Sequence, residues 1–154
     1  MPKVLISDKM SPLAEQVFKD RGIEVDVKTG MTPEELIACI GDYDGLAVRS
    51  STKAKTEIIE AATNLKVIGR AGIGVDNIDV ATATSRGVLV MNTPFGNSTT
   101  TAEHAISMIL ALARDIPQAN ASTHLGKWEK SRFMGMEVTG KTLGVIGCGN
   151  IGSI

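Results

Sequence analysis

A glycine-rich segment near the end of the chain has the residue types and spacing of a phosphate-binding loop. The segment is Gly147-Cys-Gly-Asn-Ile-Gly152, and it directly follows a short apolar run at residues 142–146. In a G-x-G-x-x-G pattern the first glycine permits a tight turn out of a strand, and the second lets backbone approach a pyrophosphate. The third lets the next helix pack closely on the sheet. The acidic residue that would hold a ribose about 20 residues further on is not in this chain. The segment therefore predicts the first half of a dinucleotide site.

Three other segments carry groups that suit anions. Arg49-Ser-Ser-Thr52 offers a guanidinium followed by hydroxyls, which suits a carboxylate or a phosphate. Residues 70–77 contain two glycines whose backbone N–H groups suit an anion nest. Asn97 and several hydroxyls occupy residues 92–98. Each segment also has a purely structural alternative, which stays open at this point. Residues 49–52 could be a surface arginine with helix-capping hydroxyls, residues 70–77 a simple chain turn, and residues 92–98 a cap for the following helix.

The elements that position these segments are short strands alternating with helices. Strands are predicted at residues 4–7, 23–27, 46–48, 65–69 and 88–90. Helices are predicted at residues 11–21, 56–62 and 78–86, and a further helix is predicted to begin at residue 32. Ser11 and Thr32-Pro-Glu-Glu35 are typical helix starts, and Gly22 suits a helix end. This alternation predicts a parallel α/β sheet covered on both faces. Ligands bind outside the carboxyl ends of such strands, where the three anion-binding candidates are expected to lie.

The chain changes character after residue 98. Residues 99–116 are apolar nearly all round, so we expect a helix buried between two domains or two subunits, broken by Pro117. A more polar helix to about residue 124, a loop at 126–133 and the strand at 142–146 are expected to follow. The predicted domains are residues 1–98, a complete α/β domain, and residues 99–154, the beginning of a second domain.

Composition and charge argue against several functions. The chain has 154 residues, of which 43% are hydrophobic and 21% charged, as in ordinary globular domains. A net charge of −1 gives no reason to expect nucleic acid or a membrane as partner. No apolar run has the length of a signal peptide or a membrane span, so we expect a cytoplasmic protein. Metal-ligand spacing is absent, and His104, in the apolar helix, is expected to be a buried structural residue.

The same segments together resemble one known family. The matching runs are Arg49-Ser-Ser-Thr-Lys53, Gly69-Arg-Ala-Gly-Ile-Gly-Val-Asp-Asn-Ile-Asp79, Met91-Asn-Thr-Pro-Phe-Gly-Asn-Ser98, Gly126-Lys-Trp128 and residues 140–152. They stand in the order seen in the D-isomer-specific 2-hydroxyacid dehydrogenases, over nearly the whole chain. The resemblance implies a flavodoxin-like substrate domain at residues 1–98 and the start of a Rossmann NAD-binding domain at 99–154. It also implies NAD-dependent oxidation of 3-phosphoglycerate to 3-phosphohydroxypyruvate, the first step of serine biosynthesis.

The resemblance assigns roles to individual residues. Arg49 and Ser50 would bind the anionic groups of a small substrate, and the backbone at Gly72 and Ile73 would hold its carboxylate, with Ile73 also facing the nicotinamide. The remaining assignments are Asn97 in the same pocket, Lys130 and Arg132 in a basic loop near the substrate, and Gly147, Gly149, Asn150, Ile151 and Gly152 at the cofactor pyrophosphate. The helix at residues 99–116 resembles the family's dimer interface, which implies a homodimer or homotetramer.

No catalytic residue is expected within this chain. The family's catalytic arginine, glutamate and histidine correspond to positions after residue 154, and proton transfer needs that histidine. We therefore expect the 154-residue chain to be inactive by itself. The choice between NAD and NADP stays open, and so do glyoxylate, lactate or formate as substrates. Two other hypotheses are an NAD-sensing transcriptional corepressor and a stand-alone anion-binding or oligomerisation module.

Overall fold

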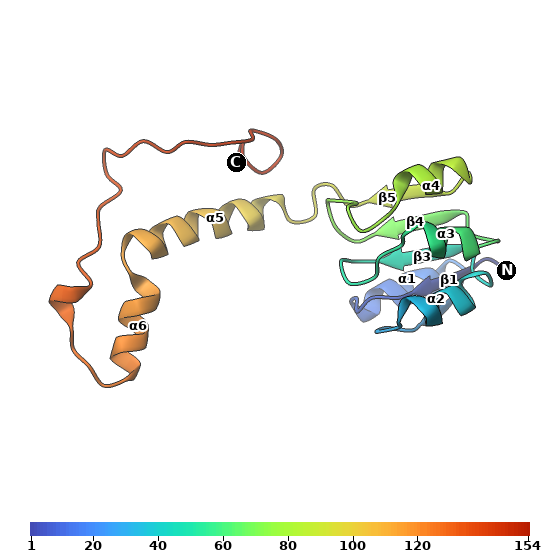
Figure 1. The fold of residues 1–154 in the computed structure, drawn as a ribbon, viewed down its shortest axis with the longest axis horizontal. Coiled ribbons are helices and arrows are strands. Elements are labelled where there is room, and N and C mark those ends of the chain that lie inside the picture. The colour runs from blue at the N-terminus through green and yellow to red at the C-terminus, as the bar shows by residue number, and fades with distance from the viewer. The chain divides into compact units, whose positions relative to one another are not determined.

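The computed structural model describes all 154 residues, which form two compact units, Met1–Gly96 and Asn97–Ile154 (Figure 1). The first unit is a five-stranded parallel sheet with helices between successive strands. Its strands are β1 (Lys3–Ile6), β2 (Glu24–Val27), β3 (Gly45–Val48), β4 (Val67–Arg70) and β5 (Leu89–Asn92). Its helices are α1 (Pro12–Asp20), α2 (Pro33–Ile40), α3 (Thr56–Ala61) and α4 (Val80–Ser85).

The strand order is β2-β1-β3-β4-β5, with every pair parallel, as in flavodoxin-like sheets. The prediction of an α/β fold with a parallel sheet is therefore confirmed. One face of the sheet carries the core, in which Leu5, Leu46 and Ile68 lie in register and pack against the helices that follow β2, β3 and β4. The residues next to them in each strand point to the opposite face.

That opposite face is covered by α1 alone. Its central row is Ile6, Ala47, Gly69 and Met91, paired strand by strand. Ile6 is buried, whereas Met91 at the β5 end is exposed, as is Leu89 on the same strand. The expectation of a sheet covered on both faces is therefore correct for the core face and only partly correct for this one, because no second helix of the first unit packs there.

Local sequence signals place the helix ends as expected. The Ser11 hydroxyl accepts a hydrogen bond from the Leu13 N–H at 3.3 Å. Thr32 and Glu35 form a reciprocal capping box at the start of α2, with bonds of 3.3 and 2.8 Å. Gly22 adopts a φ of 70° directly after α1, a conformation that costs glycine little. Three short-range patterns thus fix where α1 and α2 begin and where α1 ends.

The second unit contains helices and no strand, and the end of one helix and one expected strand differ from the prediction. It contains α5 (Ser98–Ala113), α6 (Ile116–His124) and a 3-10 turn, η1 (Lys130–Arg132). The helix expected to run to residue 116 ends at Ala113 because Asp115 adopts a φ of 51°, and Pro117 lies in the first turn of α6. The strand expected at residues 142–146 does not form, since this unit contains no other strand with which it could pair.

Within a single copy of the chain, the apolar helix α5 is largely exposed, and its predicted burial between subunits stays a prediction. Ile106, Met108, Leu110 and Leu112 of α5 are all exposed, and so is His104, for which the sequence predicts burial. Helix α6, residues 135–136 and residues 143–154 of the same unit lie against α5, and most of its surface is left uncovered. None of the helices combines the length and the apolar character that a membrane span requires.

Candidate functional site

The candidate anion-binding loops meet at one edge of the sheet. Because all five strands are parallel, the loops after β1, β3, β4 and β5 leave the same edge. Arg49 follows β3 directly, and the register pairs Val48 with Arg70 and Arg70 with Asn92 at the strand ends. The structure therefore brings Arg49 and Ser50 to the same edge as Gly72 and Ile73.

The loop that carries Arg49 and Ser50 is held by two buried side chains. The Asp8 carboxylate accepts from the Arg49 N–H at 2.6 Å, from the Thr52 N–H at 3.0 Å and from the Thr52 hydroxyl at 2.8 Å. The Asn77 amide nitrogen donates to the Arg49 carbonyl at 2.8 Å and to the Thr52 carbonyl at 2.6 Å. Asp8 and Asn77 are each only 5% exposed. The side chains of Arg49 and Ser50 are exposed, so the loop is fixed through its backbone and presents its polar groups outward.

The glycine loop after β4 is built over a guanidinium. Arg70 Nη1 lies 2.6 Å from Asp76 Oδ1, and this ion pair lowers the pKa of the Asp76 carboxyl. A Cβ atom at Gly72 would lie 3.3 Å from Arg70 Nε, and one at Gly74 would lie 3.0 Å from Asp76 Oδ1. Neither glycine has a positive φ. Their small size, rather than an unusual backbone conformation, lets the loop pass close to the ion pair.

The β5 end fixes the same loop from its other side. Asn92 Nδ2 donates to the Ile73 carbonyl at 2.6 Å, and the Thr93 N–H donates to the Gly72 carbonyl at 2.9 Å. The Gly72 N–H is used internally, donating to the Arg70 carbonyl at 3.0 Å, whereas the Ile73 N–H makes no bond to another backbone group. Of the two predicted backbone donors, Ile73 is the one left available for an anion.

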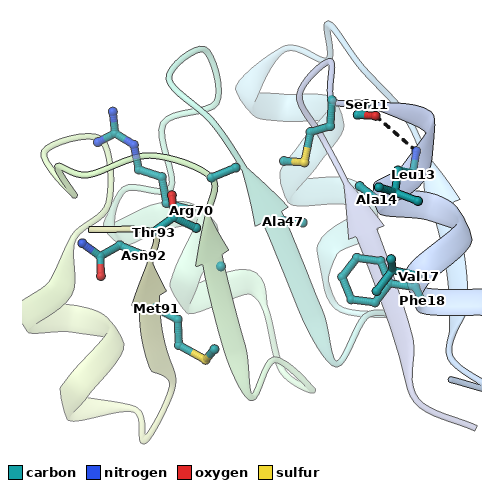
Figure 2. Close-up of a pocket in the computed structure, with 13 residues that line it drawn as sticks. Ser11, Leu13, Ala14, Val17, Phe18, Ala47, Arg70, Met91, Asn92 and Thr93 are labelled. Carbon is teal, nitrogen blue, oxygen red and sulfur yellow. Dashed lines mark hydrogen bonds between the residues drawn. The ribbon is translucent and has the colours of Figure 1, made fainter. Parts of the chain in front are cut away.

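An apolar cavity of about 460 Å³ lies beside this edge, between α1 and β3 to β5 (Figure 2). Figure 2 shows Val17 and Phe18 of α1 facing Met91 of β5 across it, with Ala47 between them. The polar residues Arg70, Asn92 and Thr93 lie together at the strand ends. The cavity is thus the uncovered part of the α1 face, and its polar end is the candidate site edge.

Sequence reasoning missed four residues that shape this edge: Asp8, Arg70, Asn77 and Asn92. Arg70 and Asn77 stand at the two ends of the predicted glycine loop, so that pattern locates them without assigning them a role. Asp8 follows the first apolar run closely, a position at the carboxyl end of a strand. Neither pattern reveals that both side chains bond to Arg49, which lies 41 positions from Asp8 and 28 positions from Asn77 in sequence.

The remaining candidates lie in the second unit. Asn97 occupies the position before α5, where its side chain makes no capping hydrogen bond and its carbonyl accepts from the Thr101 N–H at 2.9 Å and hydroxyl at 2.8 Å. The side-chain capping alternative is therefore not what the structure contains. The exposed side chain of Asn97 is left without a structural partner.

Lys130 and Arg132 lie in η1, where one is paired and the other is not. Arg132 Nη1 lies 3.3 Å from Glu129 Oε1, and Glu129 also accepts from the Ser122 hydroxyl at 2.6 Å. The Ser122 hydroxyl and, less strongly, Arg132 lower the pKa of Glu129. Lys130 is exposed and makes no ion pair, so its ammonium group is the freer of the two cations.

The glycine-rich segment at residues 147–152 is exposed apart from Ile151, which is half-buried. Gly147 has a φ of 99°, and the Gly147 carbonyl occupies the place that a Cβ atom at Gly152 would need. A Cβ at Gly149 would meet nothing within 4 Å. The first and third glycines are therefore required by the turn itself, and backbone at Gly149 and Asn150 is open to an approaching group.

A family model of the D-isomer specific 2-hydroxyacid dehydrogenase catalytic domain matches residues 4–149. The chain belongs to the D-isomer specific 2-hydroxyacid dehydrogenases. The match extends through both units, so residues 97–149 belong to the same family pattern as the sheet. This confirms the family resemblance of the sequence motifs and places the chain in a family of enzymes.

Individual known proteins are similar to the chain in sequence and in structure. D-3-phosphoglycerate dehydrogenase of Archaeoglobus fulgidus is 55% identical over 150 residues, which are 97% of this chain and 28% of that protein. The crystal structure of the TT0316 protein from Thermus thermophilus has a TM-score of 0.89 at 31% identity, with 98% of this chain and 50% of that one covered.

A second solved structure contains the cofactor. It is NAD+-bound 3-phosphoglycerate dehydrogenase of Entamoeba histolytica, with a TM-score of 0.79 and 33% identity over 99% of this chain and 48% of that one. The chain thus spans about half or less of the proteins it matches.

Proposed function

We propose that this chain provides the substrate-binding edge of an NAD-dependent dehydrogenase that oxidises 3-phosphoglycerate to 3-phosphohydroxypyruvate in serine biosynthesis. The observation that carries the proposal is the 55% identity to a D-3-phosphoglycerate dehydrogenase over 150 residues, 97% of this chain. The geometry of the first unit supports it, because an exposed guanidinium and a free backbone N–H lie along one sheet edge.

The substrate carries a carboxylate and a phosphate, and the edge offers donors for such anionic groups. In this proposal the guanidinium of Arg49 and the hydroxyl of Ser50 bind anionic oxygens, as planar and hydroxyl donors do. The N–H of Ile73 and the backbone at Gly72 hold the carboxylate, and Asn97, Lys130 and Arg132 are further proposed substrate contacts. Exposed Lys9 and Lys53 flank Arg49 and make this edge attractive to a small anion.

NAD is the proposed cofactor, and the glycine-rich segment fits its pyrophosphate. The backbone at Gly149 is open, and the N–H groups of Gly149, Asn150 and Ile151 donate to no backbone carbonyl. Successive free N–H groups of this kind bind phosphate oxygens. Gly147 and Gly152 hold the turn that presents them. When bound, NAD+ supplies the hydride acceptor, while the residues of this chain bind and orient.

The chain alone is proposed to bind substrate without oxidising it. Removal of the hydroxyl proton needs a base within hydrogen-bond reach, and no residue of the described edge combines that position with a free basic group. Arg49 and Arg70 are permanently charged, and the Asp8 carboxylate is fully engaged with Arg49 and Thr52.

The exposed apolar face of α5 is proposed to bury itself against a second copy of the chain, giving a homodimer or homotetramer. A run of large apolar side chains of this kind marks an interaction surface. Static light scattering of the wild-type chain and of a Leu110→Glu, Leu112→Glu variant tests this proposal. A wild-type mass equal to one chain would refute it, and the double variant is expected to be monomeric.

Calorimetric titration of the 154-residue chain with 3-phosphoglycerate tests the substrate assignment. We expect 3-phosphoglycerate to bind more tightly than D-lactate, glyoxylate or formate, because only it carries the phosphate. Tighter binding of D-lactate would reassign the substrate within the family. In parallel, absorbance at the NADH band with NAD+ and 3-phosphoglycerate is expected to stay flat, and a steady rise would refute the inactivity of the isolated chain.

A further inference from the structure

Two buried side chains connect three of the loops at the candidate site. Asp8 belongs to the loop after β1, and its hydrogen bonds go to Arg49 and Thr52 in the loop after β3. Asn77 is the last residue of the glycine loop after β4, and both of its hydrogen bonds go to the same two residues. The Arg49–Thr52 segment is therefore held by its N–H groups on one side and by its carbonyls on the other.

Neither side chain is needed to start or end a helix. Ser11 caps α1, and Asp79 caps α4 by accepting from the Thr82 N–H at 3.0 Å. The hydrogen bonds of Asp8 and Asn77 serve only the loop that carries Arg49 and Ser50. Nearby helices would keep their own capping interactions if either side chain were replaced.

Asn77 also has a feature that stability alone does not favour. Its Oδ1 atom is buried without a hydrogen-bond partner, although the amide nitrogen of the same group makes two bonds. An unpaired buried acceptor costs free energy, and such costs concentrate at functional sites. The asparagine is therefore better explained by the positions it enforces than by the stability it adds.

We propose that Asp8 and Asn77 are positioning residues that set the spacing between the Arg49–Ser50 donors and the Ile73 N–H. This inference rests on the proposed function, since those donors are the ones assigned to the anionic substrate. Asn77 lies in the same loop as Ile73 and donates to the backbone of the Arg49–Thr52 loop, so it links the two halves of the pocket directly. Asp8 fixes the same segment from β1, which prevents it from rotating about the Asn77 contacts.

The test uses Asn77→Ala and Asp8→Asn in the 154-residue chain, with Asn64→Ala, at an exposed asparagine that also joins two loops, as the control. Asn64 Nδ2 donates to the Gly41 carbonyl at 2.7 Å. This bond also joins two loops, the one before β3 and the one before β4, but these loops lie at the opposite edge of the sheet. Affinity for 3-phosphoglycerate is measured by calorimetry. Amide hydrogen exchange of Arg49 and Thr52 is measured without ligand, and thermal midpoints report the fold.

We expect both site variants to bind at least about ten-fold more weakly, since losing one charge-assisted hydrogen bond to an anion corresponds to about ten- to a hundred-fold in affinity. Exchange at Arg49 and Thr52 should accelerate in the Asp8 variant, which loses a shared acceptor, and in the Asn77 variant, which frees the carbonyls. The control should keep wild-type affinity and wild-type exchange in this loop. The midpoints of the site variants are expected to fall, because each variant loses buried hydrogen bonds. Affinity is therefore measured at a temperature well below every midpoint, so that global unfolding does not account for the loss.

Two outcomes separate the failure of this inference from the failure of the proposed function. If the wild-type chain binds 3-phosphoglycerate and the Asn77 variant binds within about two-fold of it, well short of the expected loss, the positioning role is refuted. If the wild-type chain does not bind, the substrate assignment fails, and unchanged exchange at Arg49 and Thr52 in both variants would then refute the positioning role on its own. Should Asp8→Asn fail to fold, Asn77→Ala alone decides the question by the same two readouts.

Discussion

The two units of the chain contain nearly the same sequence signal and give opposite structures. In the first unit, Val67-Ile-Gly69 is a strand between β3 and β5, and Ile68 is completely buried. In the second unit, Val145-Ile-Gly147 is also an apolar pair followed by glycine, yet it forms no strand and Ile146 is fully exposed. The difference lies in the neighbours, since a strand needs an adjacent strand to which it can hydrogen-bond. A strand-like pattern therefore specifies a strand only where the pairing strands are present.

The largest expected effect compares the same substitution in these two runs. Ile68→Ala should lower the free energy of unfolding of the first unit by about 2–5 kcal/mol, because it leaves a cavity in the core. Ile146→Ala should change the free energy of unfolding of the second unit, to which it belongs, by less than about 0.5 kcal/mol, because the side chain is already in water. Urea denaturation followed by circular dichroism measures both. A loss for Ile146→Ala comparable to that of Ile68→Ala would mean that residues 142–146 are paired as a strand in solution.

The next prediction places binding at one edge of the sheet. Arg49→Ala should weaken 3-phosphoglycerate binding about ten- to a hundred-fold, the range expected for losing charge-assisted hydrogen bonds of about 1.5–3 kcal/mol. The matched control is Arg86→Ala, an exposed arginine that follows α4 and precedes β5, and so lies toward the opposite edge. Calorimetric titration should give wild-type affinity for the control. Equal losses for both variants would indicate that binding depends on overall charge and not on this edge.

The accuracy of the sequence-based predictions differs between the two units, and the cause is again whether the neighbouring elements are present. The strands and helices of the first unit follow from local patterns, such as the capping box at Thr32 and Glu35. These patterns are sufficient there because the sheet on which the helices pack and within which the strands pair is complete. The candidate edge was also predictable, since Arg49 and Gly72 both come just after strands. The contacts of Asp8 and Asn77 were not, because they join residues distant in sequence. In the second unit, the expected burial of α5 depended on surfaces that its own residues do not supply.

A third prediction concerns pH and tests how firmly the first unit is held. The hydroxyl of Thr56 and the backbone and hydroxyl of Thr82 lower the pKa of Asp79 to about 2. The folded pKa lies below the ordinary value, so the stabilising contribution is complete above about pH 4 and is lost as the pH falls toward about 2. Asp79→Asn should therefore lower the thermal midpoint at about pH 7, and the gap to the wild type should close near pH ~2. A gap that is the same at both pH values would contradict the assigned contacts.

The smallest expected effect concerns how each unit reverses its chain after a helix. The first unit uses glycine at positive φ after α1 and α4, at Gly22 and Gly87, whereas α5 is followed by Asp115 at a φ of 51°. An L-residue pays a steric cost there that glycine avoids, so Asp115→Gly should stabilise the α5–α6 turn by up to about 1 kcal/mol. The Ala119 N–H donates to the Asp115 carbonyl at 2.9 Å, and the hydrogen exchange of this N–H should slow by a few-fold.

The control is Arg114→Gly, one residue earlier at a φ of −108°. This variant should speed the exchange of the Ala119 N–H, because glycine gains nothing at a negative φ and adds freedom to the unfolded chain. Faster exchange in Asp115→Gly would mean that the aspartate is favoured at this turn by a contact of its side chain, and that the two units reverse their chains by different means.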